Sequence, residues 1–201
     1  MRIKYFDFES KPIDENSTSQ MGDCYKAYLD NDNQFRFIET IEENEVVSID
    51  YYLGDNEVID EVLEKYKHLK QLNFFTKKHI SGEFSRYEVI TYFENVKQNV
   101  IRLQVFKDLL LAIYDLAADT TTNQKVYFSK NHYDLENRLH YEFEYESNGE
   151  FKKITVYDPT NYVDTSDFTI LPHQVGKHNN AYGFDWEGFE YYQKALPIFP
   201  E

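Results

Sequence analysis

Alternation between apolar and polar residues is the feature of this 201-residue sequence that most constrains its fold. It is strictest over residues 139–146, where four apolar or aromatic residues alternate with polar ones: Leu139, Tyr141, Phe143 and Tyr145 against His140, Glu142, Glu144 and Glu146. Asn148-Gly149 follows, a dipeptide that favours a tight hairpin turn. The return run, 151–157, places Lys152 and Lys153 opposite the glutamates, so opposite charges can pair across the strands. The segment predicts an antiparallel hairpin.

A weaker form of this alternation marks the N-terminal quarter. Residues 1–8 predict a strand, and a polar loop from Glu9 to Gly22 is expected after it. Apolar residues then recur at alternate positions, with breaks at Asp30-Asn31-Asp32-Asn33 and at Glu42-Glu43-Asn44. Asp and Asn suit such turns because they tolerate left-handed backbone conformations. The pattern therefore predicts an antiparallel meander of about three strands, ending near Tyr51.

Helical periodicity replaces the alternation from Asn56 to about Lys70. Six apolar residues share one helical stripe: Val58, Ile59, Val62, Leu63, Tyr66 and Leu69. Asp55 or Asn56 is expected to cap the helix, because a side-chain oxygen there can accept a backbone hydrogen bond. The acidic residues at its start and the basic residues at its end also suit the helix dipole.

The segment from Tyr87 to Ala118 fits two periods at once. The favoured interpretation is two strands, about 85–93 and 100–106, followed by a short helix over about 108–118, with a single long helix as the alternative. Regular patterning fades after Asp158-Pro159, and residues 161–201 are expected to wrap the domain as a loop-rich tail, with a short helix near 186–195. The sequence thus predicts a single α+β domain over residues 1–201, an antiparallel β-meander with hairpins packed against two or three helices.

Composition limits the class of protein. Hydrophobic residues make up 41% of the chain and aromatic residues 17%, which is too apolar for a disordered acidic chain. A net charge of -15 disfavours contact with nucleic acid or an anionic membrane. The single cysteine, Cys24, excludes an internal disulfide. The N-terminal residues do not match a signal peptide, and the longest apolar run, 109–113, is too short for a membrane span, so a cytoplasmic location is expected.

The sequence contains no catalytic motif. Asp30-x-Asp32-x-Gln34 begins like a calcium loop, but Phe35 stands where that loop needs glycine. None of the six histidines has the spacing of a helix-borne metal pair, and no glycine-rich phosphate loop or nucleophile elbow is present. His140, Glu142 and Glu144 also match any solvent-facing strand. No catalytic residue, metal or cofactor is therefore predicted.

One acidic stretch is the strongest candidate for function. Between Phe37 and Glu64 the chain has no lysine or arginine, and ten carboxylates fall within it. Tyr51 and Tyr52 lie in its middle, so large amphipathic rings accompany the negative charge, a combination suited to gripping a basic protein surface. The predicted partner-binding residues are Glu39, Glu42, Glu43, Glu45, Asp50, Tyr51, Tyr52, Asp55 and Glu57.

A second candidate surface surrounds the only tryptophan. Trp186 lies between two carboxylates, Asp185 and Glu187, and two glycines flank this triplet at positions 183 and 188. Aromatic residues such as tryptophan often dominate the binding energy of protein interfaces. The competing interpretation is that Trp186 anchors the C-terminal tail to the core.

In being small, acidic and free of catalytic motifs, the chain resembles bacterial immunity proteins of polymorphic and contact-dependent toxin systems. The resemblance implies a cytoplasmic inhibitor that occludes the basic surface of a cognate toxin domain. Two alternatives stay open. The acidic surface could serve solubility alone, or the chain could be a small-ligand or carbohydrate-binding protein or a hydrolase with an aromatic and carboxylate cleft. A deep pocket would favour the second alternative, and a shallow acidic face with exposed tyrosines would favour the inhibitor.

Overall fold

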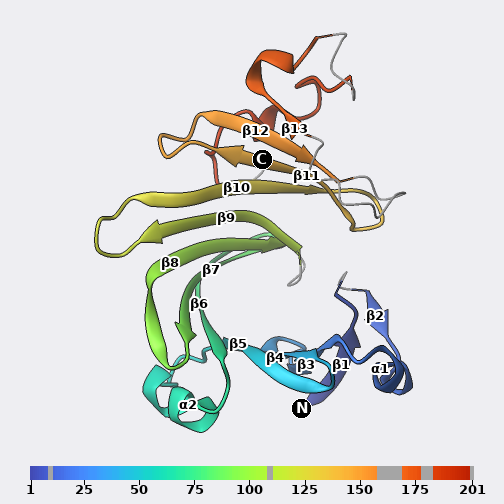
Figure 1. Cartoon of the computed structure of the whole chain (residues 1–201), viewed down its shortest axis with the longest axis vertical. Helices are drawn as coiled ribbons and strands as arrows, with labels where there is room; N and C mark the ends of the chain where they lie inside the picture. Colours follow the sequence, from blue (N-terminus) through green and yellow to red (C-terminus); the bar gives the residue numbers. More distant parts are fainter. Residues whose placement is uncertain (9–10, 108–110, 158–168, 178–182, 200–201) are drawn as a thin grey trace. The chain divides into compact units, whose positions relative to one another are not determined.

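The fold is built almost entirely from β-strands (Figure 1). The computed structural model describes residues 1–8, 11–107, 111–157, 169–177 and 183–199. Within these ranges 13 strands form one sheet in the order β13-β12-β11-β10-β9-β8-β7-β6-β5-β4-β3-β1-β2. The described residues contain only two short α-helices, so the predicted α+β class is wrong and the fold is essentially all-β.

The elements follow one another along the chain with short connections. The strands are β1 (Arg2–Phe6), β2 (Pro12–Ile13), β3 (Cys24–Leu29), β4 (Phe35–Glu42), β5 (Glu45–Tyr52), β6 (Gln71–Ser81), β7 (Phe84–Phe93), β8 (Val96–Lys107), β9 (Leu111–Asp119), β10 (Lys125–Tyr133), β11 (Leu139–Tyr145), β12 (Phe151–Val156) and β13 (Thr169–Ile170). The helices are α1 (Glu15–Met21) and α2 (Ile59–Tyr66), with 3₁₀ turns η1 (Pro172–Gln174) and η2 (Glu190–Tyr192). No helix among the described residues is long and apolar enough to cross a membrane.

The chain divides into two compact units. Unit 1 consists of Met1–His79 and Tyr87–Ile101, and unit 2 of Ile80–Arg86 and Arg102–Glu201. The division falls inside β6, β7 and β8, where the sequence has no linker composition. Each unit has its own hydrophobic core.

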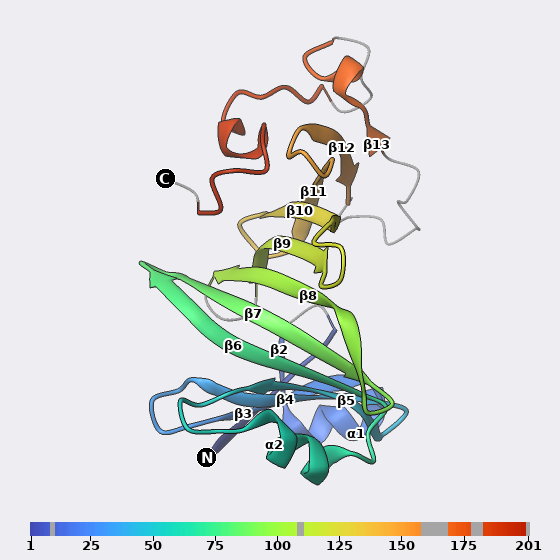
Figure 2. The same ribbon diagram turned by 90° about the vertical axis from the view of Figure 1, so that its left-hand side faces the viewer.

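In unit 1 the predicted meander is confirmed as β3, β4 and β5, which pair antiparallel. β5 then pairs parallel with β6, and α2 provides the crossover connection that a parallel pair requires. The helix buries Val62 in a core with Ile49 and Leu72 of these two strands (Figures 1 and 2). The predicted helix exists but is shorter than 56–70. Its N-cap residue is Val58, which makes no side-chain cap, so the predicted caps Asp55 and Asn56 are wrong.

The expected loop from Glu9 to Gly22 contains a strand, β2, and a helix, α1, while residues 9 and 10 lie outside the described part. Asp14 caps α1 by accepting a hydrogen bond from the backbone N–H of Asn16, at 2.8 Å. Gly22 ends the helix in a left-handed conformation with φ 74°. The helical residues are mostly Ser, Thr and Asn, which carry little helical periodicity, and only the two caps mark the helix in the sequence.

The ambiguous segment 87–118 is resolved as strands. β7 confirms the strand predicted near 85–93, and β8 is longer than the predicted 100–106 because it starts at Val96. β9 occupies Leu111–Asp119, so the predicted helix over 108–118 is wrong there, and residues 108–110 lie outside the described part. The reason is burial: most residues of β8 and β9 are at least partly covered on both faces, so consecutive positions can be apolar and the strand period is lost.

Unit 2 contains the predicted C-terminal hairpin. β11 and β12 pair antiparallel with Phe143 opposite Ile154, and Lys153 forms an ion pair with Glu144 at 2.5 Å, as the alternation predicts. Parts of the predicted tail, residues 161–168, 178–182 and 200–201, lie outside the described residues. The described parts contain β13 and two 3₁₀ turns, and the helix expected near 186–195 is reduced to η2.

The C-terminal segment 183–199 covers one face of the unit 2 sheet (Figure 2). Its apolar residues join a core that includes Phe128, Phe143 and Ile154. Lys130 of β10 points into the same layer and is 0% exposed. Its ammonium donates to the backbone carbonyls of Tyr191 at 2.7 Å and Lys194 at 2.9 Å. A buried lysine thus connects this irregular segment to the sheet.

Candidate functional site

The structure distributes the predicted acidic residues over both faces of the sheet. Glu39 lies opposite Ile49 in the β4–β5 ladder, and Asp50 lies opposite Ile38. Because side chains alternate across a strand, the two carboxylates point to opposite faces. Each is also engaged within the fold: Glu39 accepts a hydrogen bond from the Tyr28 hydroxyl at 3.0 Å, and Asp50 accepts one from the Asn73 amide at 2.7 Å. They do not form one continuous surface.

Glu57 is the centre of a structural cluster. Its carboxylate accepts hydrogen bonds from Arg36 at 2.7 Å, the Tyr51 hydroxyl at 2.8 Å and the backbone N–H of Gly54 at 2.7 Å. Burial raises the pKa of Glu57, but the three donors outweigh burial, so its pKa is lowered overall. A carboxylate with all these partners stabilises the start of the β5–α2 connection and is not free for another protein.

The two predicted tyrosine anchors lie inside the protein. Tyr52 is only 8% exposed, and its ring packs on Phe75 with centroids 4.8 Å apart. Tyr51 packs against the α2 core, and burial together with its hydrogen bond to Glu57 raises its pKa to about 12. Their assignment as exposed anchors is therefore corrected: adjacent strand residues point to opposite faces, and here both faces are covered.

The turn between β4 and β5 carries the carboxylates that remain exposed. Glu42, Glu43 and Glu45 are all exposed, and none of them forms an ion pair with a residue of the described ranges. Glu43 and Asn44 have positive φ angles of 50° and 66°, as in a two-residue hairpin turn. The Glu43 N–H donates to Asp23 at 2.8 Å, which fixes the turn on the neighbouring strand connection. Three negative charges are thus held on one rigid turn.

An aromatic pair lies beside these charges on the same unit. Tyr25 of β3 pairs with Thr40 of β4, and its ring centroid lies 4.9 Å from that of Phe8, which is 45% exposed. Burial raises the pKa of Tyr25, and the charges of Asp50 and Glu42 raise it further, so both carboxylates act on its hydroxyl. We call Phe8, Tyr25, Glu42, Glu43 and Glu45 the acidic–aromatic surface.

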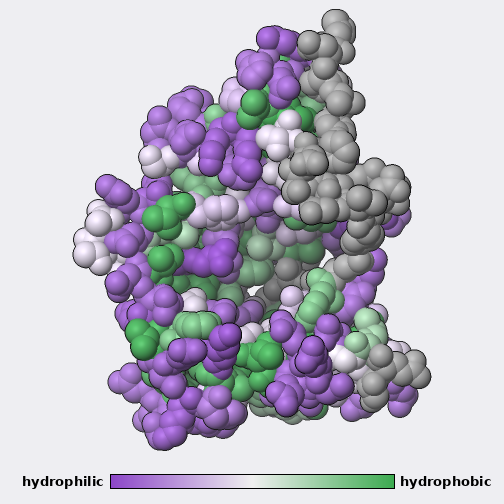
Figure 3. All heavy atoms as spheres, in the orientation of Figure 1, coloured by the Kyte–Doolittle hydropathy of each residue, from purple (hydrophilic) through white to green (hydrophobic). Residues whose placement is uncertain are grey.

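Sequence reasoning missed Phe8 and Tyr25 as members of this surface. Their contact requires β1 to pair with β3, with Phe6 opposite Tyr25. The available signal was that Phe8 continues the Phe6 face by one further step of two. Asp55 is exposed but follows β5 at its other end, away from the β4–β5 turn. Figure 3 shows further hydrophilic side chains over α2, where Asp60 and Glu61 are exposed.

The second predicted surface is a core anchor. Trp186 packs edge-on against Phe151 with ring centroids 5.0 Å apart, and against Phe184 at 5.4 Å. Asp185 and Glu187 are exposed, but the Asp185 carboxylate accepts the N–H of Glu187 at 2.9 Å and so closes a local turn. The triplet fastens the C-terminal segment to unit 2.

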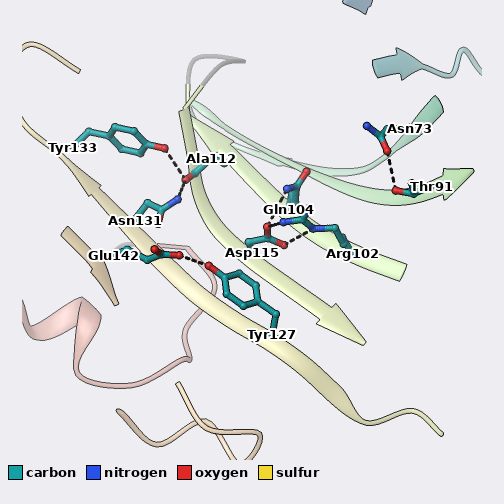
Figure 4. Close-up of polar contacts among 10 residues, drawn as sticks. All are labelled: Asn73, Thr91, Arg102, Gln104, Ala112, Asp115, Tyr127, Asn131, Tyr133 and Glu142. Carbon is teal, nitrogen blue, oxygen red and sulfur yellow. Dashed lines mark hydrogen bonds and ion pairs between the residues drawn. The ribbon is translucent and has the colours of Figure 1, made fainter. Parts of the chain in front are cut away.

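Unit 2 contains a cavity of about 430 Å³. It lies where β9 and β10 separate: their ladder pairs residues as far as Tyr114 and Lys130, and beyond that point the Ala112 carbonyl accepts hydrogen bonds from the side chains of Asn131 and Tyr133 (Figure 4). Its lining includes four aromatic residues and several polar ones, among them Phe84, Tyr133, Tyr191, Tyr192, Lys107 and Asn137.

The charges around this cavity are compensated. Lys107 lies 3.6 Å from Glu83. Asp134 accepts the N–H of Arg138 and pairs with its guanidinium at 2.8 Å, and these contacts lower its pKa. Burial and nearby His140 lower the pKa of His132, so its imidazole is neutral at pH 7. The Nδ1 atom of His132 is buried and has no hydrogen-bond partner.

A polar network occupies the opposite face of the unit 2 sheet from Lys130. Arg102 and Gln104 of β8 both donate to Asp115, and Tyr127 donates to Glu142 (Figure 4). Each carboxylate has its donors within the network, so neither is poised as an acid or base. The described residues contain no group of three or more His, Cys, Asp or Glu side chains that could hold a metal ion.

Comparison with known proteins gives no match for this chain. No family model matches it, and neither a curated protein nor a solved structure is similar to it.

Proposed function

We propose that this protein is a binding protein that uses its acidic–aromatic surface to recognise a basic surface on another protein. The observation that carries the proposal is the rigid β4–β5 turn, whose three exposed glutamates have no ion-pair partner in the described ranges and lie beside the partly exposed Phe8–Tyr25 pair. The resemblance to bacterial immunity proteins supports a cognate toxin domain as the partner and the cytoplasm as the location.

The two parts of the surface have different physical roles. Exposed charges attract an oppositely charged partner and raise the rate of association. Aromatic rings contribute most of the affinity when contact removes them from water, and surrounding polar groups keep water out. Phe8 and Tyr25 replace Tyr51 and Tyr52 in this second role, because they are the rings that reach solvent next to the glutamates.

A partner suited to this surface presents lysine or arginine side chains around an apolar recess. Enzymes that act on nucleic acids have such basic active-site surfaces, because they neutralise phosphates. Occlusion of that surface would inhibit the enzyme without any chemistry by the inhibitor. This agrees with the absence of a catalytic motif in the sequence.

Identification of the partner is the first experimental step. The immobilised protein is used to capture proteins from a lysate of its native host, and the retained basic protein is identified and purified. Its dissociation constant is then measured for the wild type, for Phe8→Ala and for Phe93→Ala. Phe93 is the matched control because it is an exposed phenylalanine of the same unit outside the surface.

We expect Phe8→Ala to weaken binding about tenfold or more, since removal of an interface aromatic costs over about 1 kcal/mol when the residue is a hot spot. Phe93→Ala is expected to bind like the wild type. Equal affinity of all three proteins for the partner would exclude the acidic–aromatic surface as the contact. Capture of no basic protein would count against the proposed function as a whole.

A further inference from the structure

The unit 2 cavity has the features of a preformed small-molecule site. Its volume of about 430 Å³ lies within the range of roughly 300–1,000 Å³ that is common for ligand pockets. Segments far apart in the sequence build it, because Phe84 precedes β8, Tyr133 ends β10 and Tyr191 belongs to η2. The cavity lies in a different unit from the acidic–aromatic surface, so it is independent of the proposed function.

The two tyrosines of η2 are held in place by contacts outside the cavity. Lys130 donates to the Tyr191 carbonyl at 2.7 Å, and its ammonium lies 3.6 Å from the centroid of the Tyr191 ring. The Tyr191 hydroxyl donates to Ile198 at 2.7 Å, and the Tyr145 hydroxyl donates to the Tyr192 carbonyl at 2.8 Å. A wall fixed in this way loses little conformational freedom when a ligand binds, which favours affinity.

Compensated charge indicates a neutral ligand. Lys107 and Glu83 have opposite charges and lie within ion-pair distance, while Asp134 is paired with Arg138. His132 is uncharged at neutral pH because burial lowers its pKa. A charged ligand would have to separate these pairs or enter without a free counter-charge, and either event opposes binding.

The mixture of wall groups indicates the chemistry of that ligand. Aromatic rings such as Phe84 and Tyr192 offer apolar faces, and Lys107, Glu83 and Asn137 offer donors and acceptors at the same cavity. A sugar ring matches both, because its C–H faces pack on aromatic rings and its hydroxyls both donate and accept hydrogen bonds. We propose that the unit 2 cavity binds a neutral sugar, a monosaccharide or the terminal ring of a glycan.

The buried polar atoms behind the wall are not assigned to recognition. Asn131 Oδ1 and His132 Nδ1 lack hydrogen-bond partners, but both atoms are shielded from solvent, so a ligand cannot reach them while the wall stays in place. The exposed side chains Lys107, Glu83 and Asn137 are the groups that would contact the hydroxyls. This choice makes the variants below specific.

The test is titration of the isotope-labelled full chain, followed by NMR, with D-glucose, D-galactose, D-mannose and N-acetyl-D-glucosamine, each to about 20 mM, which detects even millimolar affinity. Glucose 6-phosphate and glucosamine are the charged probes. The expected result is a saturable shift of backbone signals at Lys107, Asn137 and Tyr191 with at least one neutral sugar, and weaker binding of both charged probes. No shift with any neutral sugar, or tighter binding of a charged probe, would overturn the proposal.

Two variants show whether a shift reports this cavity. Phe84→Leu keeps an apolar side chain but removes the ring, and we expect it to weaken sugar binding at least about fivefold. Phe93→Leu is the matched control in unit 1 and should bind like the wild type. Lys107→Gln changes an exposed side chain and preserves the fold even if Phe84→Leu does not. Unchanged affinity in Lys107→Gln and in a folded Phe84→Leu would overturn the site. Neither result bears on the acidic–aromatic surface.

Discussion

The two units cover an apolar sheet face by different means. Unit 1 uses a regular helix, α2, which contributes Val62 to the core and satisfies its own backbone hydrogen bonds. Unit 2 uses the irregular segment 183–199, whose carbonyls have no helical or strand partners over much of its length. Buried carbonyls without donors are costly. Lys130 supplies the missing donors from β10, although its ammonium is completely buried.

This difference explains why each unit has its particular buried charge. In unit 1 the Glu57 carboxylate is partly exposed and meets a full counter-charge on Arg36 at 2.7 Å. In unit 2 Lys130 forms no ion pair with any residue of the described ranges, and its partners are two carbonyls and the ring of Tyr191. Unit 2 should therefore depend more strongly on a single polar residue than unit 1.

The largest effect is expected for Lys130→Ala. It removes both hydrogen bonds to the C-terminal segment and leaves a cavity, so we expect the free energy of unfolding to fall by about 4 kcal/mol. Urea unfolding followed by the fluorescence of Trp186, which lies on the same core, measures this loss. Lys130→Met is the control for side-chain volume, and a loss of about 2 kcal/mol is expected because two carbonyls still lack donors. A fully stable Lys130→Met protein would show that the carbonyl contacts do not matter.

The next effect is a dependence on pH. Burial lowers the pKa of Lys130 to about 7, so between pH 7 and about pH 10 the unfolded chain binds this proton and the folded chain does not. The free energy of unfolding should therefore rise by about 2 kcal/mol from pH 7 to pH 9. The neighbouring Tyr114, Tyr145 and Tyr191 stay neutral in this window because burial raises their pKa values.

The control for this pH dependence is Lys130→Met, which should lack the rise. Urea unfolding at pH 7, 8 and 9 on both proteins makes the comparison. A wild-type protein whose stability is as flat as that of the variant would mean that the Lys130 ammonium keeps its proton, held by the carbonyls and the Tyr191 ring.

A smaller effect is expected for Val62→Ala, which tests the helical cover of unit 1. The substitution deletes two buried methyl groups from the contact of α2 with β5 and β6, so the free energy of unfolding should fall by about 1.5 kcal/mol. Chemical denaturation followed by circular dichroism gives the value. Exposed Val58 at the helix start is the matched site, and Val58→Ala should change stability by less than about 0.5 kcal/mol. Similar losses at both sites would contradict the packing of α2.

The smallest effect is expected for Glu57→Gln. The amide can still accept hydrogen bonds, but it loses its charge opposite Arg36, and we expect a loss of about 1 kcal/mol because the pair is partly exposed. The lowered pKa of Glu57 means that this contribution is present at neutral pH and disappears as pH falls through its folded-state pKa. The variant and the wild type should therefore converge in stability below about pH 4. A constant difference down to pH 3 would show that charge is not the cause.

The sequence predicts a strand well where one face of the sheet meets water. The hairpin around Phe143 alternates strictly because its partner positions, such as Glu142 and Glu144, are polar. β8 and β9 are partly covered on both faces, so their apolar residues also fit a helical period and the predicted helix at 108–118 is wrong. Local periodicity cannot reveal what covers the second face of a strand.

The candidate site shows the same limit. The exposed glutamates Glu42, Glu43 and Glu45 lie in the acidic stretch that the sequence singles out, because turn residues and charge are both local signals. The burial of Tyr51 and Tyr52 depends on α2, β6 and β7, which the strand itself does not encode. The Phe8–Tyr25 contact depends on pairing between β1 and β3.

The affinity for a basic partner, measured by calorimetry for two charge-matched triple variants, tests the central claim most directly. One variant neutralises the turn, Glu42→Gln, Glu43→Gln and Glu45→Gln, and the other neutralises exposed carboxylates of α2, Asp60→Asn, Glu61→Gln and Glu64→Gln. Both change the net charge equally. We predict that the turn variant binds about tenfold or more weakly and depends less on salt, while the α2 variant binds like the wild type. Equal weakening of both would show that only net charge matters, and would contradict a specific binding surface.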